Sequence, residues 1–185
     1  MNKKMILIGG YLATGKSTFA DRLSDALHIP YFDKDTTKEV LAEDIGESHM
    51  GAIRRLSLAA FSLMYCIAER QMQAGAPFVL ESNFRRPEVE RLHALAAQNG
   101  YECLMLIFVG DFEGLFARYS ARDAGRHWVH KSKDRPETCA SYKDENLQFG
   151  DIAVGERVHY VDMTTFDAAR SGELIGIVSS FLAGD

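Results

Sequence analysis

Hydrophobic positions along the chain follow two alternating patterns, short apolar runs and longer segments with apolar residues at helical spacing. The run at residues 5–8 ends in Gly-Gly and is typical of a central parallel strand that is buried on both faces. Four further short segments are also interpreted as strands. The five predicted strands are residues 5–8, 31–33, 78–80, 102–109 and 158–162.

The segments between these strands carry apolar residues every three or four positions, which indicates helices. The predicted helices are residues 16–27, 38–43, about 50–74, 87–98, 112–122 and 172–182. The helix that begins near residue 50 is apolar on nearly all sides, so we expect it to be largely buried. Residues 123–157 have weak periodicity, and a long irregular segment in a compact domain is usually functional.

This alternation predicts the α/β class, with a doubly wound parallel sheet of five strands that binds ligands at the carboxyl ends of its strands. The chain has 185 residues, no internal repeat and no linker, so we expect one domain over residues 1–185. Hydrophobic residues make up 46% and charged residues 25%, which excludes a disordered chain. The net charge of −5 argues against extended binding to nucleic acid.

The sequence also bears on location. Cys66, Cys103 and Cys139 are widely spaced and form neither a disulfide framework nor a zinc motif, which fits a reducing compartment. The longest apolar run, residues 103–109, is far shorter than the 18 or more residues of a membrane span. The apolar start of the chain is interrupted by Gly9 and Gly10 before a signal peptide is complete. We therefore expect a cytoplasmic protein with no membrane contact.

The segment from Gly10 to Ser17 reads GYLATGKS and fits the pattern GxxxxGK[ST] between a buried strand and an amphipathic helix. In this P-loop motif, successive backbone N–H groups surround phosphate oxygens at a helix N-terminus. Lys16 would reach the outer phosphates and the hydroxyl of Ser17 would ligate Mg²⁺. We predict ATP and Mg²⁺ as cofactors. The predicted nucleotide-binding residues are Gly10, Ala13, Thr14, Gly15, Lys16, Ser17 and Thr18.

Among P-loop proteins, the sequence favours a small phosphoryl-transfer kinase. A guanine-nucleotide switch needs an NKxD motif, which is absent from the sequence, and a large motor ATPase needs more than 185 residues. A small kinase needs a substrate region after the second strand, an acid beside the acceptor hydroxyl, and a basic lid after the fourth strand. We predict the substrate region at about residues 36–74 and the lid at about residues 118–157.

Carboxylates stand at the ends of the second and third predicted strands. Asp33 and Asp35 follow the second strand, and either could act as the base, although an aspartate at the position of Asp35 could instead cap the next helix. Glu81 closes the third strand, where it would support the magnesium ion or contact a substrate hydroxyl. Asn83 lies two residues further on and is a candidate for substrate binding.

Arginines recur every four residues after the fourth strand, at Arg118, Arg122 and Arg126. If the helix continues, they form one stripe that could close over the phosphates and neutralise charge on the transferred group. The alternative is a solvated helix face. Trp128 in the same segment would either cover a ligand or anchor the loop.

The sequence resembles the AAA_33-type P-loop kinase-like proteins, which are similar to polynucleotide 5′-hydroxyl kinases, chloramphenicol phosphotransferase and the zeta toxins. The segments that carry the resemblance are residues 10–17, 34–41, 79–84 and 118–127. It spans about residues 5–130 and implies a nucleoside-monophosphate-kinase-like fold that binds ATP. In the polynucleotide-kinase pattern a basic group follows the acid by three residues, which corresponds to Asp35 and Lys38 and favours Asp35 as the base.

Together these features predict an ATP-dependent phosphotransferase that moves the γ-phosphate to a hydroxyl of a small molecule or of a nucleic-acid 5′ end. The catalytic candidates are Lys16, Asp35, Arg122 and Arg126, with Asp33, Lys38, Glu81 and Asn83 on the substrate side. The alternative is a regulatory module that binds nucleotide with little or no phosphotransfer. The sequence does not identify the acceptor.

Overall fold

The computed structural model describes residues 3–46, 50–123, 125–131, 135–165 and 168–184. A five-stranded sheet in the order β2-β3-β1-β4-β5 forms its centre, and every neighbouring pair of strands is parallel. The strands are β1 (Lys4–Gly10), β2 (Tyr31–Asp33), β3 (Phe78–Glu81), β4 (Glu102–Val109) and β5 (Val158–Asp162). The predicted α/β class and five-stranded parallel sheet are therefore confirmed.

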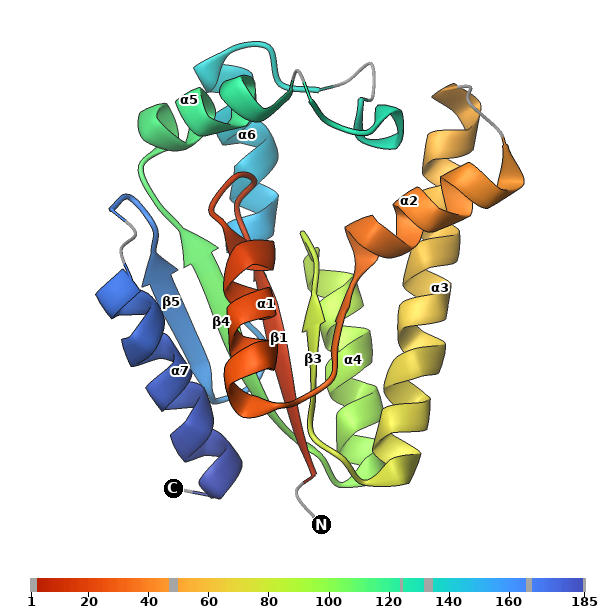
Figure 1. Ribbon diagram of the computed structural model, residues 1–185, viewed down its shortest axis with the longest axis vertical. Coiled ribbons are helices and arrows are strands. Elements are labelled where there is room, and N and C mark those ends of the chain that lie inside the picture. The colour runs from red at the N-terminus through yellow and green to blue at the C-terminus, as the bar shows by residue number, and fades with distance from the viewer. Residues whose placement is uncertain (1–2, 47–49, 124, 132–134, 166–167, 185) are drawn as a thin grey trace.

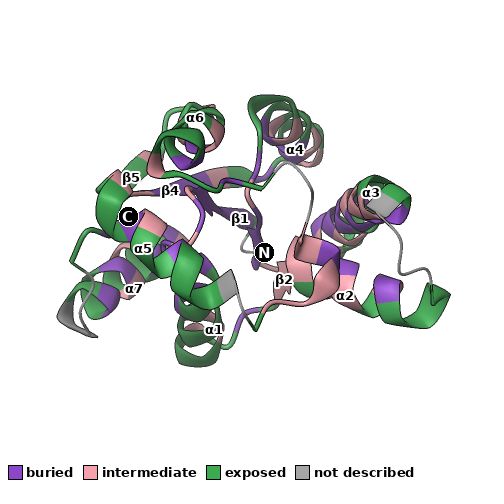
Figure 2. Cartoon of the chain, turned by 90° about the horizontal axis from the view of Figure 1, so that it is seen from above, coloured by how far each residue is buried: buried purple, intermediate pink, exposed green. Residues whose placement is uncertain are grey.

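Helices cover both faces of this sheet (Figures 1 and 2). Helices α1 (Lys16–Leu27) and α7 (Ala168–Ala183) lie on one face. Helices α3 (Met50–Ala74), α4 (Arg86–Asn99) and α6 (Cys139–Gly150) lie on the other. Helices α2 (Lys34–Ile45) and α5 (Phe112–Asp123) and the short turn η1 (Trp128–His130) lie beyond the carboxyl ends of the strands (Figure 1).

The two faces of the central strand β1 bury separate apolar clusters. Met5 and Leu7 point to the side of α3 and α4, whereas Ile6 and Ile8 point to the side of α1 and α7. All four side chains are fully buried. Each contributes about 1.5–3 kcal/mol to stability, because successive side chains of a strand face opposite sides and both sides here exclude water. This packing fixes the end of β1, from which the P-loop begins.

Helix α3 differs from its prediction. Leu58 and Leu63 are 61% and 42% exposed, so the expectation of a largely buried helix is wrong. The helix lies at the side of the molecule and packs mainly through Leu56, Met64 and Ala68, which leaves its other side in water. Within the described ranges, Gly51–Ala74 is the one helix long and apolar enough to cross a membrane, but length and composition alone are weak evidence for a membrane span.

The segment 123–157 also departs from its prediction, because part of it is regular. Helix α6 occupies Cys139–Gly150, and the hydroxyl of Thr138 caps it by accepting the N–H of Ser141 at 3.1 Å. Residues 124 and 132–134 of the predicted lid lie outside the described residues. The other elements agree with their predictions within a few residues. The larger differences are α2, which runs over Lys34–Ile45, and α7, which begins at Ala168.

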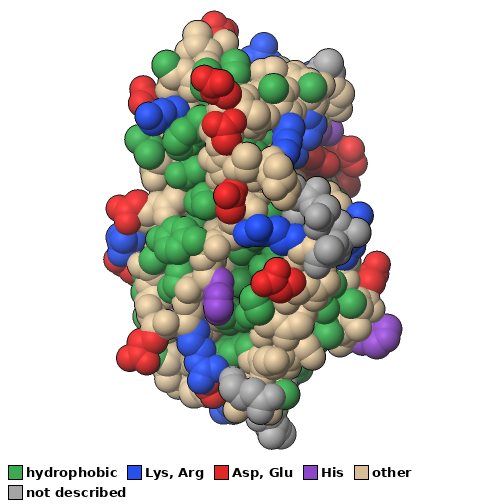
Figure 3. Space-filling view, turned by 90° about the vertical axis from the view of Figure 1, so that its left-hand side faces the viewer, with side chains coloured by type: hydrophobic (Ala, Val, Ile, Leu, Met, Phe, Trp, Pro, Cys, Tyr) green, Lys and Arg blue, Asp and Glu red, His purple; other side chains and the backbone are tan. Residues whose placement is uncertain are grey.

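Surface charge is mixed on the face of the molecule that Figure 3 shows. On the face that carries β5 and α7, positive and negative side chains are interspersed, with apolar side chains between them (Figure 3). The described residues form no broad positive area on this face, in keeping with the net charge of −5. At the carboxyl end of the sheet, acidic and basic side chains instead line one cavity.

Candidate functional site

The P-loop leaves β1 in a conformation that its glycines make possible. Gly10 has φ +117°, and a Cβ at this position would lie 2.1 Å from the carbonyl oxygen of Phe108. Only glycine can therefore occupy this position without displacing β4. Gly15 has φ +86° and immediately precedes α1, where the loop turns into the helix. The loop thus presents its N–H groups at a helix N-terminus, as phosphate binding requires.

Lys16 lies within the curve of this loop. Its side-chain amine donates a hydrogen bond to the carbonyl of Tyr11 at 2.6 Å, and the residue is 6% exposed. Burial lowers the pKa of Lys16, while the nearby carboxylate of Glu81 opposes this shift. The amine therefore stands over the loop where phosphate oxygens would lie.

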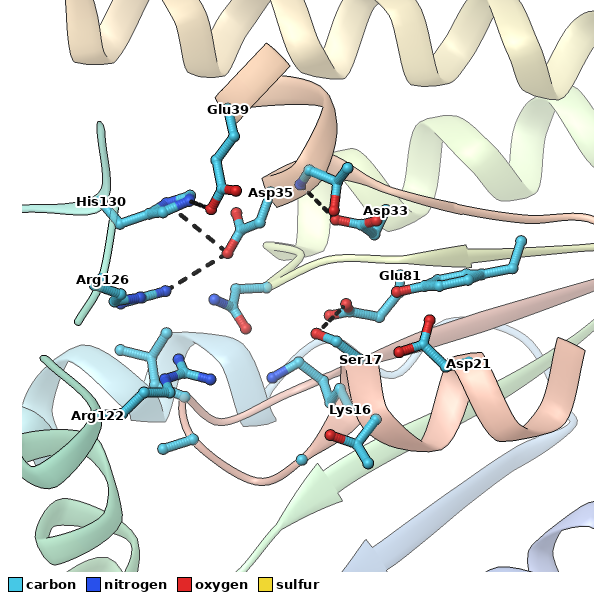
Figure 4. A pocket seen from close by; sticks show the side chains of 17 residues that line it. Lys16, Ser17, Asp21, Asp33, Asp35, Glu39, Glu81, Arg122, Arg126 and His130 are labelled. Atoms are coloured by element: carbon cyan, nitrogen blue, oxygen red, sulfur yellow. Dashed lines mark hydrogen bonds and ion pairs between the residues drawn. The ribbon is translucent and has the colours of Figure 1, made fainter. Parts of the chain in front are cut away.

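Ser17, in the first turn of α1, contacts Glu81 at the end of β3. The register of β1 with β3 pairs Ile8 with Glu81, so the end of β3 lies beside the first turn of α1. The hydroxyl of Ser17 donates to Glu81 Oε2 at 2.8 Å (Figure 4). Burial raises the pKa of Glu81, and the charge of Lys16 partly reverses this shift. A hydroxyl and a buried carboxylate in contact form an oxygen donor set that suits Mg²⁺.

The two aspartates after β2 have different environments. Asp33 caps α2, because its Oδ1 accepts the N–H of Thr36 at 2.6 Å. The alternative that Asp35 caps this helix is therefore wrong, and the reason is geometric: the cap precedes the first turn, whereas Asp35 is already within it. Burial raises the pKa of Asp33.

Asp35 is surrounded by basic side chains. Its carboxylate lies 3.2 Å from Lys34 Nζ, 3.6 Å from an Arg126 guanidinium nitrogen and 4.0 Å from His130 Nδ1 (Figure 4). Burial alone would raise its pKa, but these three groups together hold it well below its usual value. His130 also contacts Glu39 at 2.8 Å. Asp35 is therefore ionised and fixed in place at the cavity wall.

The predicted arginine stripe is interrupted, because α5 ends at Asp123. Arg118 donates to the carbonyls of Met163 and Thr164 at 2.9 and 2.8 Å, so it fastens α5 to the end of β5 instead of facing a ligand. Arg122 at the end of α5 and Arg126 beyond it both line the cavity. The prediction of one continuous helical stripe is wrong, although two of its arginines reach the site.

Lys38 and Trp128 join the lid segment to α2 and α3. The amine of Lys38 donates to the carbonyl of Val129 at 2.9 Å, and burial lowers its pKa to about 8. Trp128 packs against an apolar cluster that includes Ala42 and Leu56. Trp128 therefore anchors the loop, and Lys38 holds η1 instead of lining the main cavity.

The sequence analysis did not identify two side chains on α6 that hold the P-loop, Tyr142 and Asn146. The hydroxyl of Tyr142 donates to the carbonyl of Leu12 at 2.6 Å, and Leu12 N–H donates to Asn146 Oδ1 at 2.6 Å. Both side chains are fully buried. They hold a P-loop residue by both of its backbone groups. The four-residue spacing of Tyr142 and Asn146 could have indicated that they share one side of a helix. The same spacing of polar residues is also typical of an ordinary solvated helix face.

These groups enclose a cavity of about 310 Å³ at the carboxyl end of the sheet. Its lining includes the predicted residues Ala13, Gly15, Lys16, Ser17, Thr18, Asp33, Asp35, Glu81, Asn83, Arg122 and Arg126. Gly10, Thr14 and Lys38 are not part of the lining, and Asp21, Tyr31, Glu39 and His130 are additional members. Lys16 and Asp35 lie on opposite walls (Figure 4).

The parallel sheet, the glycine-rich loop after β1 and the polar cavity at its end define a P-loop protein with the fold of small kinases. The family model of AAA_33, described as an AAA domain, matches residues 5–137. The chain belongs to this AAA_33 family. No curated protein matches the chain.

Solved structures share this fold over almost the whole chain. A "putative kinase" from Chloroflexus aurantiacus j-10-fl is 28% identical, with a TM-score of 0.83 over 97% of this chain and 98% of that one. A gluconokinase from Sinorhizobium meliloti 1021 is 16% identical, with a TM-score of 0.63 over 99% and 95%. A shikimate kinase from Bacteroides thetaiotaomicron is 13% identical, with a TM-score of 0.55 over 97% and 98%. The two more distant structures support the fold alone.

Proposed function

We propose that the protein is an ATP-dependent phosphotransferase that moves the γ-phosphate to an alcohol hydroxyl. The observation that carries this proposal is the placement of Lys16 and Asp35 on opposite walls of one cavity, with Arg122 and Arg126 beside them. A phosphate-binding loop faces an ionised carboxylate across a space that a phosphoryl group and an acceptor could share. This arrangement suits in-line transfer, in which positioning and charge stabilisation supply most of the catalysis.

Each side chain then has a role. The P-loop N–H groups and Lys16 bind the phosphates, while Arg122 and Arg126 neutralise charge on the transferred group. The carboxylate of Asp35 orients the acceptor hydroxyl and takes its proton as the new bond forms. Asp35 is ionised at neutral pH, as a proton acceptor must be, but contact with its basic neighbours lowers its pKa and makes it a weaker base while they remain beside it. Arg126 is paired with Asp35 at 3.6 Å, so nucleotide binding would draw this arginine toward phosphate.

The donor set of Ser17 and Glu81 fits a magnesium ion, because both side chains offer oxygen atoms and the carboxylate is buried beside the hydroxyl. Ser17 would bind the ion. Glu81 would orient the Ser17 hydroxyl and the water molecules bound to the ion. When bound, Mg²⁺ would neutralise charge on the phosphates. Residues 118–157 would serve as the lid, with residues 36–74 as the acceptor side.

The change Asp35→Asn tests this proposal, because asparagine preserves size but cannot take the proton. We expect γ-phosphate transfer to fall by about 100- to 10,000-fold, with ATP binding nearly unchanged. Transfer of labelled γ-phosphate to a library of alcohols is measured beside a nucleotide-binding assay. Asp33→Asn is the matched comparison and should have a milder effect, because asparagine also caps helices well and, among the described residues, Asp33 forms no ion pair with a basic side chain.

Two results would contradict the proposal. Transfer by Asp35→Asn at the wild-type rate would show that Asp35 is not the base. Binding of ATP by the wild-type protein without transfer to any alcohol would favour the alternative function, a regulatory module that binds nucleotide.

A further inference from the structure

A second cavity of about 210 Å³ adjoins the nucleotide cavity. The two cavities share Leu12, Asp35, Asn83, Arg126 and His130 in their linings, so these residues lie where the cavities meet. Residues 15–18 of the P-loop and α1 line the first cavity and none of them lines the second. The second cavity is therefore placed to hold the molecule that receives the phosphate.

Its wall carries charges of both signs. Lys34, Arg85, Arg126 and Arg135 line it, against the carboxylates of Asp35, Glu88 and Glu145. Lys34 and Arg126 are both committed to Asp35, at 3.2 and 3.6 Å. Arg85 and Arg135 line the same cavity. Guanidinium groups bind carboxylate and phosphate through paired hydrogen bonds.

Arg85 is the clearest of these groups. It precedes the first turn of α4, whose N–H groups add partial positive charge to the same end of the cavity. Its backbone N–H donates to the side chain of Glu88, which caps the helix, so this acid is already occupied. Among the described residues, the Arg85 guanidinium has neither a hydrogen bond nor an ion pair, although its neighbour Arg86 is paired with Asp151 at 2.8 Å.

Asn83 supplies a second, independent sign of a ligand. Its Oδ1 atom is buried and has no hydrogen-bond partner among the described residues. A buried polar atom without a partner costs roughly 1–3 kcal/mol, so such atoms commonly await a ligand or water. Asn83 lies in the lining of both cavities, as Asp35 does. A hydroxyl where the cavities meet could contact Asp35 and Asn83 together.

We propose that the acceptor is a small alcohol that also carries an anionic group, either carboxylate or phosphate. Arg85 and Arg135 bind this anion, while the reacting hydroxyl lies between Asp35 and Asn83. The volume is below the roughly 300–1,000 Å³ of sites for drug-sized ligands, which favours a small molecule over a nucleic-acid end. This inference rests on the proposed function and adds the substrate class to it.

The reaction balances with ATP as the only co-reactant. The acceptor oxygen forms a bond to the γ-phosphorus, and the bond from that phosphorus to the β,γ-bridging oxygen breaks. ADP leaves with that electron pair, and the hydroxyl proton passes to Asp35 and then to water. The anionic group of the acceptor takes no part in the bond changes and serves only to position the hydroxyl.

The test compares matched acceptors with Mg²⁺ and labelled ATP. Glycerate is paired with glycerol, gluconate with glucitol, and ribose 5-phosphate with ribose, within a wider library of metabolite pairs that differ in one anionic group. A 5′-hydroxyl oligonucleotide is included. We expect kcat/KM to be at least about 10-fold higher for the anionic members, since a charge-assisted contact has roughly this effect. Comparison of the carboxylate acceptors with the phosphate acceptors shows which of the two anions is bound.

Two variants localise the anion. Arg85→Gln and Arg135→Gln should each raise KM for the anionic acceptor by about 10-fold or more and leave KM for ATP unchanged. Arg86→Gln is the control, because this adjacent arginine pairs with Asp151 outside the cavity. Preference for neutral acceptors or for the oligonucleotide, or an unchanged KM in Arg85→Gln, would overturn the inference while the phosphotransferase stands. Absence of transfer to any alcohol would overturn the proposed function as well.

Discussion

Two lysines at the site keep a positive charge in surroundings that disfavour it. Lys16 is buried against the P-loop carbonyl of Tyr11, and Lys38 is buried against the carbonyl of Val129. Burial of an ammonium group costs free energy unless a partner compensates. The two residues differ in what they face, because Lys16 lines the nucleotide cavity and Lys38 does not.

Lys16→Ala should weaken ATP binding by about 10-fold or more without lowering stability. The lysine would contact phosphate, and its removal takes a poorly compensated charge out of the folded protein. Calorimetric titration with ATP gives the affinity, and urea unfolding gives the stability. Wild-type affinity in this variant would contradict the assignment of the P-loop as the phosphate site.

Lys38 should make stability depend on pH. Its pKa in the folded protein is about 8, below the ordinary value of 10.5, so between these values the unfolded chain binds more protons. The free energy of unfolding of the wild type should therefore rise, relative to Lys38→Met, by about 1 kcal/mol or more as pH increases from 8 to 10. The measurement is urea unfolding of both proteins at pH 7, 8.5 and 10.

Lys3→Met is the control for this comparison, because the exposed amine of Lys3 also donates to a backbone carbonyl, that of Asn99 at 2.9 Å. A difference between the wild type and Lys38→Met that stays constant with pH would show that the Lys38 amine is well solvated.

At the scale of elements, α6 is the support on which the P-loop rests. The loop N–H and carbonyl of Leu12 both bond to α6, and Asn146 Nδ2 in turn donates to the carbonyl of Tyr142 at 2.7 Å. Helix α6 lies within the segment 118–157 that we predict as the lid, so this segment also supports the P-loop. Earlier in the same segment, η1 is held by α2 through Lys38 and Glu39.

Tyr142→Phe removes one hydroxyl from this support and should lower ATP affinity by roughly fivefold, the effect of about 1 kcal/mol. Tyr101→Phe is a matched control, since its buried hydroxyl also donates to backbone carbonyls, those of Gln71 and Ala76, far from the cavity. Both variants should lose similar stability in urea unfolding. Equal ATP affinity in the two variants would show that Tyr142 contributes only to folding.

For the whole molecule, α3 joins two apolar clusters. Its residue Leu56 packs with α2 and η1, whereas Met64 and Ala68 pack in the core against the sheet. A helix shared in this way should couple the unfolding of both regions. One domain over residues 1–185 remains a prediction, and it requires such coupling.

Trp128 allows a direct test of that expectation, because it is the only tryptophan in the sequence and lies in the cluster outside the sheet. We expect urea unfolding followed by its fluorescence to coincide in midpoint and slope with unfolding followed by far-ultraviolet circular dichroism. ATP with Mg²⁺ should shift both transitions to higher urea together. A fluorescence transition at lower urea would mean that α2, η1 and the adjoining part of α3 unfold as a separate unit.

The sequence by itself determined the strands, most helices and the P-loop. These features depend on residues close together in the chain: apolar runs form buried strands, and Gly10 to Ser17 form a loop whose shape follows from its own glycines. The carboxylates Asp33, Asp35 and Glu81 could also be placed at one edge, because parallel strands end together. Their location was therefore predictable, but their individual roles were not.

Only the tertiary structure decided those roles, because they depend on partners far away in the chain. Asp35 is distinguished from Asp33 by Arg126 and His130, which reach it from the lid. Asn146 is a buried polar residue on a helix that has no strong apolar side, and its position was recognisable only once Leu12 lay against it. Local patterns record which surfaces avoid water, whereas the pairing of polar groups is set by how the elements pack.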